Sequence, residues 1–531
     1  DKTYIDISRA KCEQRDRLIR DEWKISKKLA IENNVLEVPK TCGILTNREI
    51  IMTEENDAVD IVEKIRQQEY TAEEVAVAFC KRAAVAQQLT NCLTEIFFEE
   101  AIDRARHLDQ ERAANPSAPW KPLHGLPISL KDSFNVPGFD STIGMTYFAN
   151  KPATEYSALP KLLLDLGAVL YCKTNVPQTM MTADSDNNIF GRTLNPSNLK
   201  LTAGGSSGGE GSLIAMRGSV LGIGTDIAGS IRIPSICNGI YGARPSSGIV
   251  PFDGQQSPED PGMVGIEVVA GPMATSSRAC SFFMKTIMSA QAWRYDSSCL
   301  HLRWQGHQCS RKPRIGLVLD DGVYTPFPPV RRTIREAAQK LRDAGVDVVE
   351  IRLPHVADAV VRLSNVSLQF VQNLIKEGNE PQVESVKRVN LAAIPKSSMQ
   401  GYMDLTAGRR KLQAAYHEFW FENELDAIML PGAPQTATRF DEWGPINYTM
   451  LWNFLDYPAT IVPTGRVRES DAADGGDFAL YGEQDKKHYK LYDSPETYID
   501  APLSVQVVGM RQEDEALAEV VGLVDQILNS S

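Results

Sequence analysis

Apolar residues recur along the chain with two spacings, which predict alternating helices and strands. The sequence TAEE at residues 71–74 fits a capping box at a helix start, and an apolar stripe follows it over residues 75–79. Further helices, two of them ended by Gly167 and Gly345, are predicted over residues 99–113, 157–166, 328–344 and 512–528. Short apolar runs predict buried strands at residues 126–130, 168–172, 314–319, 346–353, 427–430, 459–462 and 503–508.

This order of elements indicates the α/β class of fold. Strands that alternate with helices form a parallel or mixed sheet, here a large twisted one, with helices on both faces. The charged residues 1–54 are expected to form a helical arm packed on the core, and residues 55–531 a single core domain. Within that domain, residues 466–500 are polar and contain two adjacent glycines, so we interpret them as a surface insertion or lid.

One stretch departs from this pattern because it is rich in glycine and serine. Residues 202–234 read TAGGSSGGEGSLIAMRGSVLGIGTDIAGSIRIP, with small-residue clusters at 204–209 and 228–230. Glycine allows a backbone to approach a ligand closely. A flexible linker has a similar composition, but the strand-like apolar sequence on both sides argues against one. We therefore predict a functional loop that presents backbone N–H groups and hydroxyls.

Two known motifs explain this loop poorly. A phosphate-binding loop needs the lysine of G-x-x-x-x-G-K-[ST], which is missing here. The nucleophile elbow G-x-S-x-G is satisfied with either Ser206 or Ser207 at its centre, but Gly/Ser-rich sequence matches it easily. The elbow also needs a downstream histidine, and His355, His417 and His488 lie in no recognisable context.

A lysine offers a better explanation. Residues 123–136 read LHGLPISLKDSFNV and place Lys131 at the end of a buried strand. Such a lysine is most often a solvated strand end, but a desolvated one has a lowered pKa and can act as the general base for a serine. Lys131, Ser206 and Ser230 would then supply a base, a relaying hydroxyl and a nucleophile without any histidine.

Three stretches, PLHGLPISLKD, GGSSGGEGS and GTDIAGSIRIP, together resemble the amidase signature family of Ser-cisSer-Lys amide hydrolases. The resemblance extends from about residue 55 to the C-terminus. It is strongest to the fungal acetamidases, and the stretch TNVPQTMMTADSDN is also similar to fatty acid amide hydrolases. It implies the amidase-signature fold and a catalytic domain over residues 55–531.

The resemblance implies a cofactor-independent hydrolase. Its substrate would be a small to medium uncharged amide, aliphatic or aryl, cleaved to a carboxylic acid and ammonia or an amine. An esterase, a fatty-acyl-amide hydrolase and a glutamine-dependent amidotransferase subunit would use the same three residues, so these activities stay open. A scaffold protein that has kept the fold is disfavoured, because all three residues are present.

The resemblance also implies a role for each residue of the site. Ser230 would attack the amide carbonyl, and Lys131 would enter neutral and take the proton through Ser206, which would follow a cis Gly205–Ser206 peptide bond. The oxyanion hole would consist of the backbone N–H groups of Ile227, Ala228, Gly229 and Ser230. Many members have glycine where this chain has Ala228, whose methyl group would narrow the acyl side or oppose a positive φ.

Neighbouring residues have expected supporting roles. The resemblance implies that Met180 lies at the substrate pocket, and it implies the same for the apolar segment YTMLWNFLDY at residues 448–457. Ser207 is expected to hydrogen-bond near Lys131 or Ser206, and Asp226 and Arg232 are expected to form an ion pair that braces the nucleophile loop or is purely structural. A further acidic pair, formed by Asp184 and Asp186, is interpreted as loop caps.

Composition limits the classes of binding partner and the cellular compartment that are expected for this chain. The formal net charge of −12 disfavours nucleic acid as a main partner, and no apolar run is long enough for a transmembrane helix. Nine scattered cysteines without C-x-x-C suggest reduced thiols in a cytoplasmic protein, and seven histidines without H-E-x-x-H make a metal site improbable. The sequence leaves open a homodimer and a targeting segment removed before Asp1.

Overall fold

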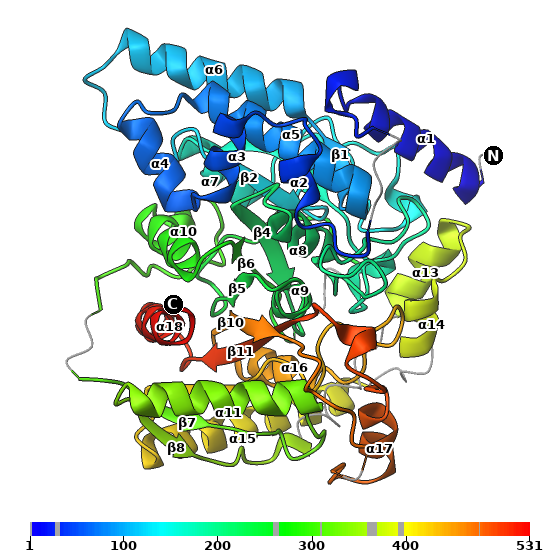
Figure 1. Cartoon of the computed structure of the whole chain (residues 1–531), viewed down its shortest axis with the longest axis vertical. Coiled ribbons are helices and arrows are strands. Elements are labelled where there is room, and N and C mark those ends of the chain that lie inside the picture. The colour runs from blue at the N-terminus through cyan, green and yellow to red at the C-terminus, as the bar shows by residue number, and fades with distance from the viewer. Residues whose placement is uncertain are drawn as a thin grey trace.

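The computed structural model describes residues 3–26, 32–258, 265–307, 311–357, 369–390, 398–476 and 478–530. Within these residues, one eleven-stranded sheet runs through the molecule in the order β1-β3-β2-β4-β6-β5-β10-β11-β9-β7-β8 (Figure 1). The strands are β1 (Leu93–Ile96), β2 (Pro127–Lys131), β3 (Val169–Thr174), β4 (Leu221–Asp226), β5 (Tyr241–Arg244), β6 (Val269–Ala274), β7 (Arg314–Leu317), β8 (Asp347–Glu350), β9 (Ala427–Pro431), β10 (Ala459–Arg466) and β11 (Pro502–Val508).

The sheet is mixed, as the sequence predicted. Strand β2 runs parallel to β3 and β4, and β7 runs parallel to β8 and β9. Between these two parallel groups, β4, β6, β5, β10, β11 and β9 pair antiparallel. The predicted mixed α/β fold is therefore confirmed, with an antiparallel centre.

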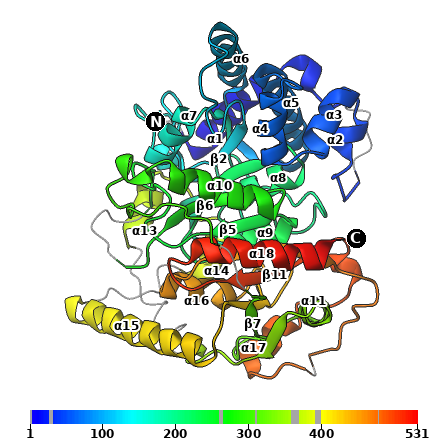
Figure 2. The ribbon, with the colours of Figure 1, turned by 90° about the vertical axis from the view of Figure 1, so that its left-hand side faces the viewer.

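Helices cover both faces of the sheet. They are α1 (Tyr4–Arg17), α2 (Val38–Thr41), α3 (Asn47–Glu54), α4 (Ala58–Arg66), α5 (Ala72–Thr90), α6 (Phe98–Ala114), α7 (Ala158–Asp165), α8 (Gly208–Ala215), α9 (Arg232–Asn238), α10 (Ser277–Ser289), α11 (Pro328–Asp343), α13 (Gln369–Glu377), α14 (Glu384–Val389), α15 (Met399–Glu422), α16 (Asn447–Leu455), α17 (Glu483–Tyr489) and α18 (Asp514–Asn529). Figure 2 shows α15 extending away from the body of the molecule.

Two adjacent residues of β5 show which helices lie on which face. Gly242 faces α9, since a Cβ there would lie 2.1 Å from Ser235 Oγ. Ala243 points the other way and belongs to the apolar cluster that contains Phe283 of α10. Helices α10, α18 and α11 pack in sequence along this second face, whereas α8 and α9 pack against each other and against the first.

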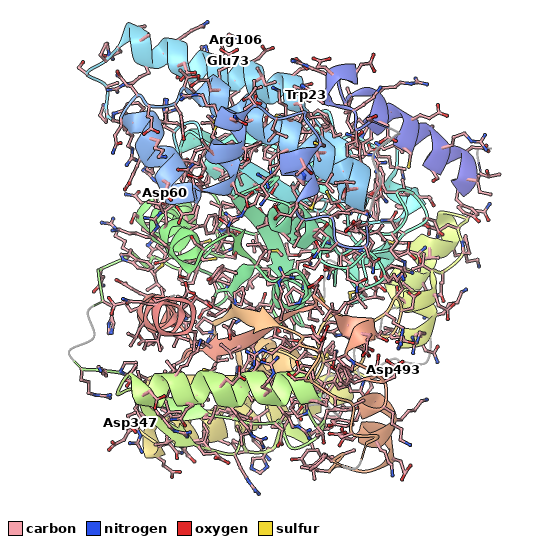
Figure 3. All side chains as sticks on the ribbon, in the orientation of Figure 1. Trp23, Asp60, Glu73, Arg106, Asp347 and Asp493 are labelled. Carbon is pink, nitrogen blue, oxygen red and sulfur yellow. The ribbon has the colours of Figure 1, made fainter. Side chains whose placement is uncertain are left out.

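The N-terminal residues pack on the first strands of the sheet. Helix α1 lies beside β1 (Figure 1), and the buried Lys11 Nζ donates to Glu95 Oε1 (2.5 Å) and to Asp140 Oδ2 (2.9 Å). The outer helices α5 and α6 are joined at the surface by Arg106 and Glu73, whose side chains meet at 2.8 Å (Figure 3).

Residues 466–500 lie partly in the core. Tyr489, Tyr492 and Tyr498 are buried in one cluster with Phe327 and with Ile233 of α9. The segment therefore contacts the helix that follows the predicted nucleophile loop.

The predicted elements agree with the observed ones where an apolar pattern is continuous. The helix predicted over residues 328–344 is α11, and the strand predicted over residues 427–430 is β9. Four strands were not predicted, namely β1, β4, β5 and β6. The eight cysteines in the described ranges are unpaired, and Cys309 lies outside them. None of the helices in those ranges combines the length and apolar character that crossing a bilayer requires.

Candidate active site

Lys131 is the last residue of β2, and its side chain is fully buried. Its Nζ lies 2.6 Å from Ser206 Oγ and 2.7 Å from Thr225 Oγ1. Thr225 belongs to the parallel neighbour β4, so adjacent strands bring the amine and this hydroxyl together. The predicted contact between Lys131 and Ser206 is present.

Burial changes the protonation of this lysine. Desolvation lowers the pKa of Lys131 to about 7, although the nearby acidic groups, Asp226 foremost, oppose the shift. About half of the Lys131 side chains are therefore neutral near pH 7. A neutral amine has a lone pair that can accept a proton.

The Gly/Ser-rich loop presents Ser206 to Lys131. The Gly205–Ser206 peptide bond is cis, as predicted. Gly205 packs directly on the backbone of residues 182–184, and a Cβ there would lie 2.5 Å from Thr182 O. Only glycine fits at this position because the two backbones touch.

Ser207 connects the loop to the next segment. Its N–H donates to Ser230 O (3.1 Å), and its Oγ accepts from the Thr225 N–H (3.4 Å). The Ser207 side chain was expected to bond near Lys131 or Ser206. It bonds instead to Thr225, whose Oγ1 contacts Lys131 Nζ. The backbone bond to Ser230 holds the two serine-bearing loops next to each other.

The loop that carries Ser230 folds around a buried carboxylate. Asp226, at the end of β4, accepts from the N–H groups of Gly229 (2.8 Å) and Ile231 (3.1 Å). Arg232 Nη2 donates to the same side chain at 3.0 Å, and both side chains are fully buried. The pKa of Asp226 lies well below its usual range because Arg232 and Asn453 outweigh the effect of burial. The predicted ion pair is therefore present, and it closes the loop.

Arg232 also binds the C-terminal part of the chain. It donates to Thr449 O (2.8 Å), to Asn453 Oδ1 (2.5 Å) and to Gln506 Oε1 (2.9 Å). Thr449 Oγ1 in turn donates to Ala228 O (2.7 Å). These partners were not predicted. Their spacing was informative, because the polar residues Thr449 and Asn453 stand one helical turn apart inside an apolar segment and so share one helix face.

The backbone donors of the loop differ from the prediction at one residue. The N–H groups of Ile227, Ala228 and Ser230 have no hydrogen-bond partner within the part of the chain that the structure describes. The N–H of Gly229 is instead bonded to Asp226, which corrects its assignment to the oxyanion hole. Gly229 has a φ of +128°, and a Cβ there would lie 2.4 Å from Thr449 Oγ1. Ala228 has no positive φ, so its methyl group causes no backbone conflict.

A second buried acid lies behind the site. Glu210 on α8 is fully buried and accepts from Ser129 Oγ (2.7 Å) and Thr174 Oγ1 (3.1 Å). Burial raises the pKa of Glu210 to about 8, so this carboxyl is protonated at neutral pH. Glu210 belongs to the stretch GGSSGGEGS, and no pattern in the sequence indicated a role for it.

One cavity brings the candidate residues together. Ser230, Ser206, Lys131 and Met180 all contribute to its wall. The other lining residues are Ser133, Met181, Thr225, Ile227, Phe252, Gln255, Gln256, Ser257, Pro258 and Val268. Among the described residues, no group of three or more His, Cys, Asp or Glu side chains is placed to hold a metal ion.

The remaining candidates lie elsewhere. Asp184 and Asp186 are not simple loop caps, because both pair with Arg192 at 2.6 Å and 2.7 Å. Nor does a histidine complete a nucleophile elbow. His488 is stacked on Phe327, and no hydrogen bond of Ser206 or Ser207 in the described residues involves a histidine.

Comparisons with known proteins agree on one family. A sequence model described as amidase matches residues 74–518. An amidase of Gibberella moniliformis is 38% identical over 94% of each chain, and an acetamidase of Aspergillus oryzae is 36% identical over 98% of each. The solved structure of a fatty acid amide hydrolase superposes with a TM-score of 0.92, at 28% identity, covering 99% of this chain and 95% of that one.

Proposed function

Because this chain belongs to the amidase family and is an amide-hydrolysing enzyme, we propose that it acts through an acyl-enzyme on Ser230. The substrate would be a small to medium uncharged amide, aliphatic or aryl. The products would be a carboxylic acid and ammonia or an amine. No step of this reaction calls for a cofactor.

The first half of the reaction forms the acyl-enzyme. Neutral Lys131 accepts the hydroxyl proton of Ser206 while Ser206 accepts the proton of Ser230, whose Oγ forms a bond to the amide carbonyl carbon. When the tetrahedral intermediate collapses, the C–N bond breaks, and the proton returns through Ser206 to the leaving nitrogen. In the second half, water gives a proton along the same route and attacks the ester, which releases the acid and restores Ser230.

The negative charge of the intermediate needs donors that are already in place. The unpaired N–H groups of Ile227, Ala228 and Ser230 are the donors that we propose. Gly229 contributes differently, since its N–H fixes the loop to Asp226. Met180 would contact the bound substrate from the cavity wall.

One observation carries this proposal. A fully buried lysine with its pKa lowered to about 7 lies 2.6 Å from Ser206, in a cavity that Ser230 also lines. Two fungal relatives are named acetamidase, which supports a short acyl group in the substrate of this chain.

The nucleophile can be tested by covalent labelling. The enzyme and its Ser230→Ala variant would be incubated with a serine-reactive fluorophosphonate and weighed by intact-mass spectrometry, with ammonia release from acetamide and benzamide measured in parallel. One adduct on the wild type, absent from the variant and accompanied by loss of turnover, is expected. An adduct that persists on Ser230→Ala would assign the nucleophile to another residue.

A further inference from the structure

Gln255 lies in the wall of the active-site cavity, in the segment that connects β5 to β6. Its carbonyl oxygen Oε1 accepts a hydrogen bond from Ser133 Oγ at 2.8 Å. Its amide nitrogen Nε2 is buried and has no hydrogen-bond partner within the described part of the chain. One end of this side chain is thus anchored and the other is free.

The anchor is tied to the catalytic strand end. Ser133 follows Lys131 by two residues, and its carbonyl oxygen also accepts the N–H of Gln256 (2.9 Å). A double contact with Ser133 therefore fixes residues 255 and 256 relative to the end of β2. Gln255 keeps a constant position relative to the proposed base.

Residues 252–254, which precede Gln255, are held by hydrogen bonds to other parts of the chain. Asp296 Oδ2 accepts the N–H groups of Phe252 (2.7 Å) and Asp253 (2.9 Å). Gly254 O accepts from Asn135 Nδ2 at 2.7 Å. Hydrogen bonds therefore hold residues 252–256 in place before any substrate binds, which reduces the entropy lost on binding.

A buried amide N–H₂ group without an acceptor is unfavourable, so each such group in a native protein calls for an explanation such as a functional role or an ordered water. The neighbouring Gln256 differs, because its Nε2 donates to Ser257 O (3.4 Å). Of these two cavity-lining glutamines, Gln255 alone has a side-chain donor without a partner within the described residues. This contrast indicates a group reserved for a bound molecule.

We propose that Gln255 is a specificity residue that donates from Nε2 to a second oxygen acceptor of the substrate. This inference rests on the proposed function. The scissile carbonyl oxygen is already provided for by backbone N–H groups, and the leaving nitrogen carries hydrogens that cannot pair with a donor. The partner of Gln255 is then a carbonyl or hydroxyl oxygen elsewhere in the substrate, and amides that carry one are preferred over aliphatic amides of equal size.

A matched pair of substrates tests this preference. Butanamide and 3-oxobutanamide differ mainly by one carbonyl, and kcat and KM would be measured for both with wild type, Gln255→Met and Gln255→Glu. Both variants should lower the kcat/KM for 3-oxobutanamide relative to that for butanamide at least tenfold, mainly through KM for 3-oxobutanamide. Ser133→Ala, which releases the anchor, should cause a smaller selective loss, and the double variant should be no worse than Gln255→Met.

The outcomes separate this inference from the proposed function. Absence of turnover and of fluorophosphonate labelling in the wild type would refute the proposed function itself. With an active wild type, an equal loss for both amides would show a structural or water-binding role and overturn the inference. An unchanged ratio of the two kcat/KM values in all variants would overturn it as well.

Discussion

The protonation of Lys131 predicts how activity depends on pH. With the ordinary lysine pKa of 10.5, about one molecule in a thousand would carry a neutral amine at pH 7.5. With a pKa of about 7, roughly three quarters do. In the proposed mechanism the neutral form of Lys131 is the active one, so kcat/KM should rise with pH through about 7 and increase about tenfold between pH 6 and pH 8.

The assay is ammonia release at low acetamide concentration, from pH 5.5 to 9.5, with circular dichroism at each pH to verify that the protein stays folded. The rate of fluorophosphonate labelling should follow the same curve, because it depends on the same base. Lys131→Met should lower activity by about 10²- to 10⁴-fold and remove the rise. A rise that persists in Lys131→Met, or a wild-type profile that is flat between pH 6 and 8, would refute the assignment of the base.

Three other substitutions test the surroundings of the site. Gly229→Ala places a Cβ 2.4 Å from Thr449 Oγ1 at a residue with a φ of +128°, so activity should fall about 10²-fold. Ala228→Gly should retain activity. Equal activities of the two variants would refute the loop geometry. Arg232→Met leaves its carboxylate partner buried and should lower the free energy of unfolding by about 3–5 kcal/mol, visible as a reduced urea midpoint. Glu210→Gln mimics the protonated acid and should keep activity at pH 7 within about threefold. Burial raises the pKa of Glu210 from 4.5 to about 8, so the free energy of unfolding of the wild type relative to this variant should decrease as the pH rises from 4.5 to 8. Denaturation curves at pH 5 and pH 8 measure this difference. They would show no change if the acid were ionised throughout.

The sequence predicted the fold where apolar residues form continuous runs. Strand β9, Ala427–Pro431, is one such run and is buried on both faces of the sheet. Strand β5 was missed because its four residues, Tyr241–Arg244, include a glycine and an arginine. Its burial depends on Asp456, more than two hundred positions away, which pairs with Arg244 at 2.8 Å. No local pattern contains that information.

The site was predictable to a similar extent. The spacing and chemistry of Lys131, Ser206 and Ser230 pointed to one centre, and the structure places all three on one cavity. The direction of the Gly229 N–H was not predictable, because it depends on how the loop folds around the Asp226 carboxylate. Gln255 stands in a polar segment without any motif, and only its contact with Ser133 distinguishes it.

The bonds from Arg232 to α16 and β11 have a consequence for biosynthesis. The proposed reacting residues Lys131, Ser206 and Ser230 all precede Arg232 in the chain, but Gln506, which accepts a hydrogen bond from Arg232, follows it by 274 residues. At typical rates of translation, the ribosome needs roughly 15 to 55 s to add that length. During this time the nascent chain already contains the three proposed reacting residues, while Arg232 lacks its contact with β11. The proposed nucleophile loop therefore gains its full set of Arg232 contacts only after β11 has been made.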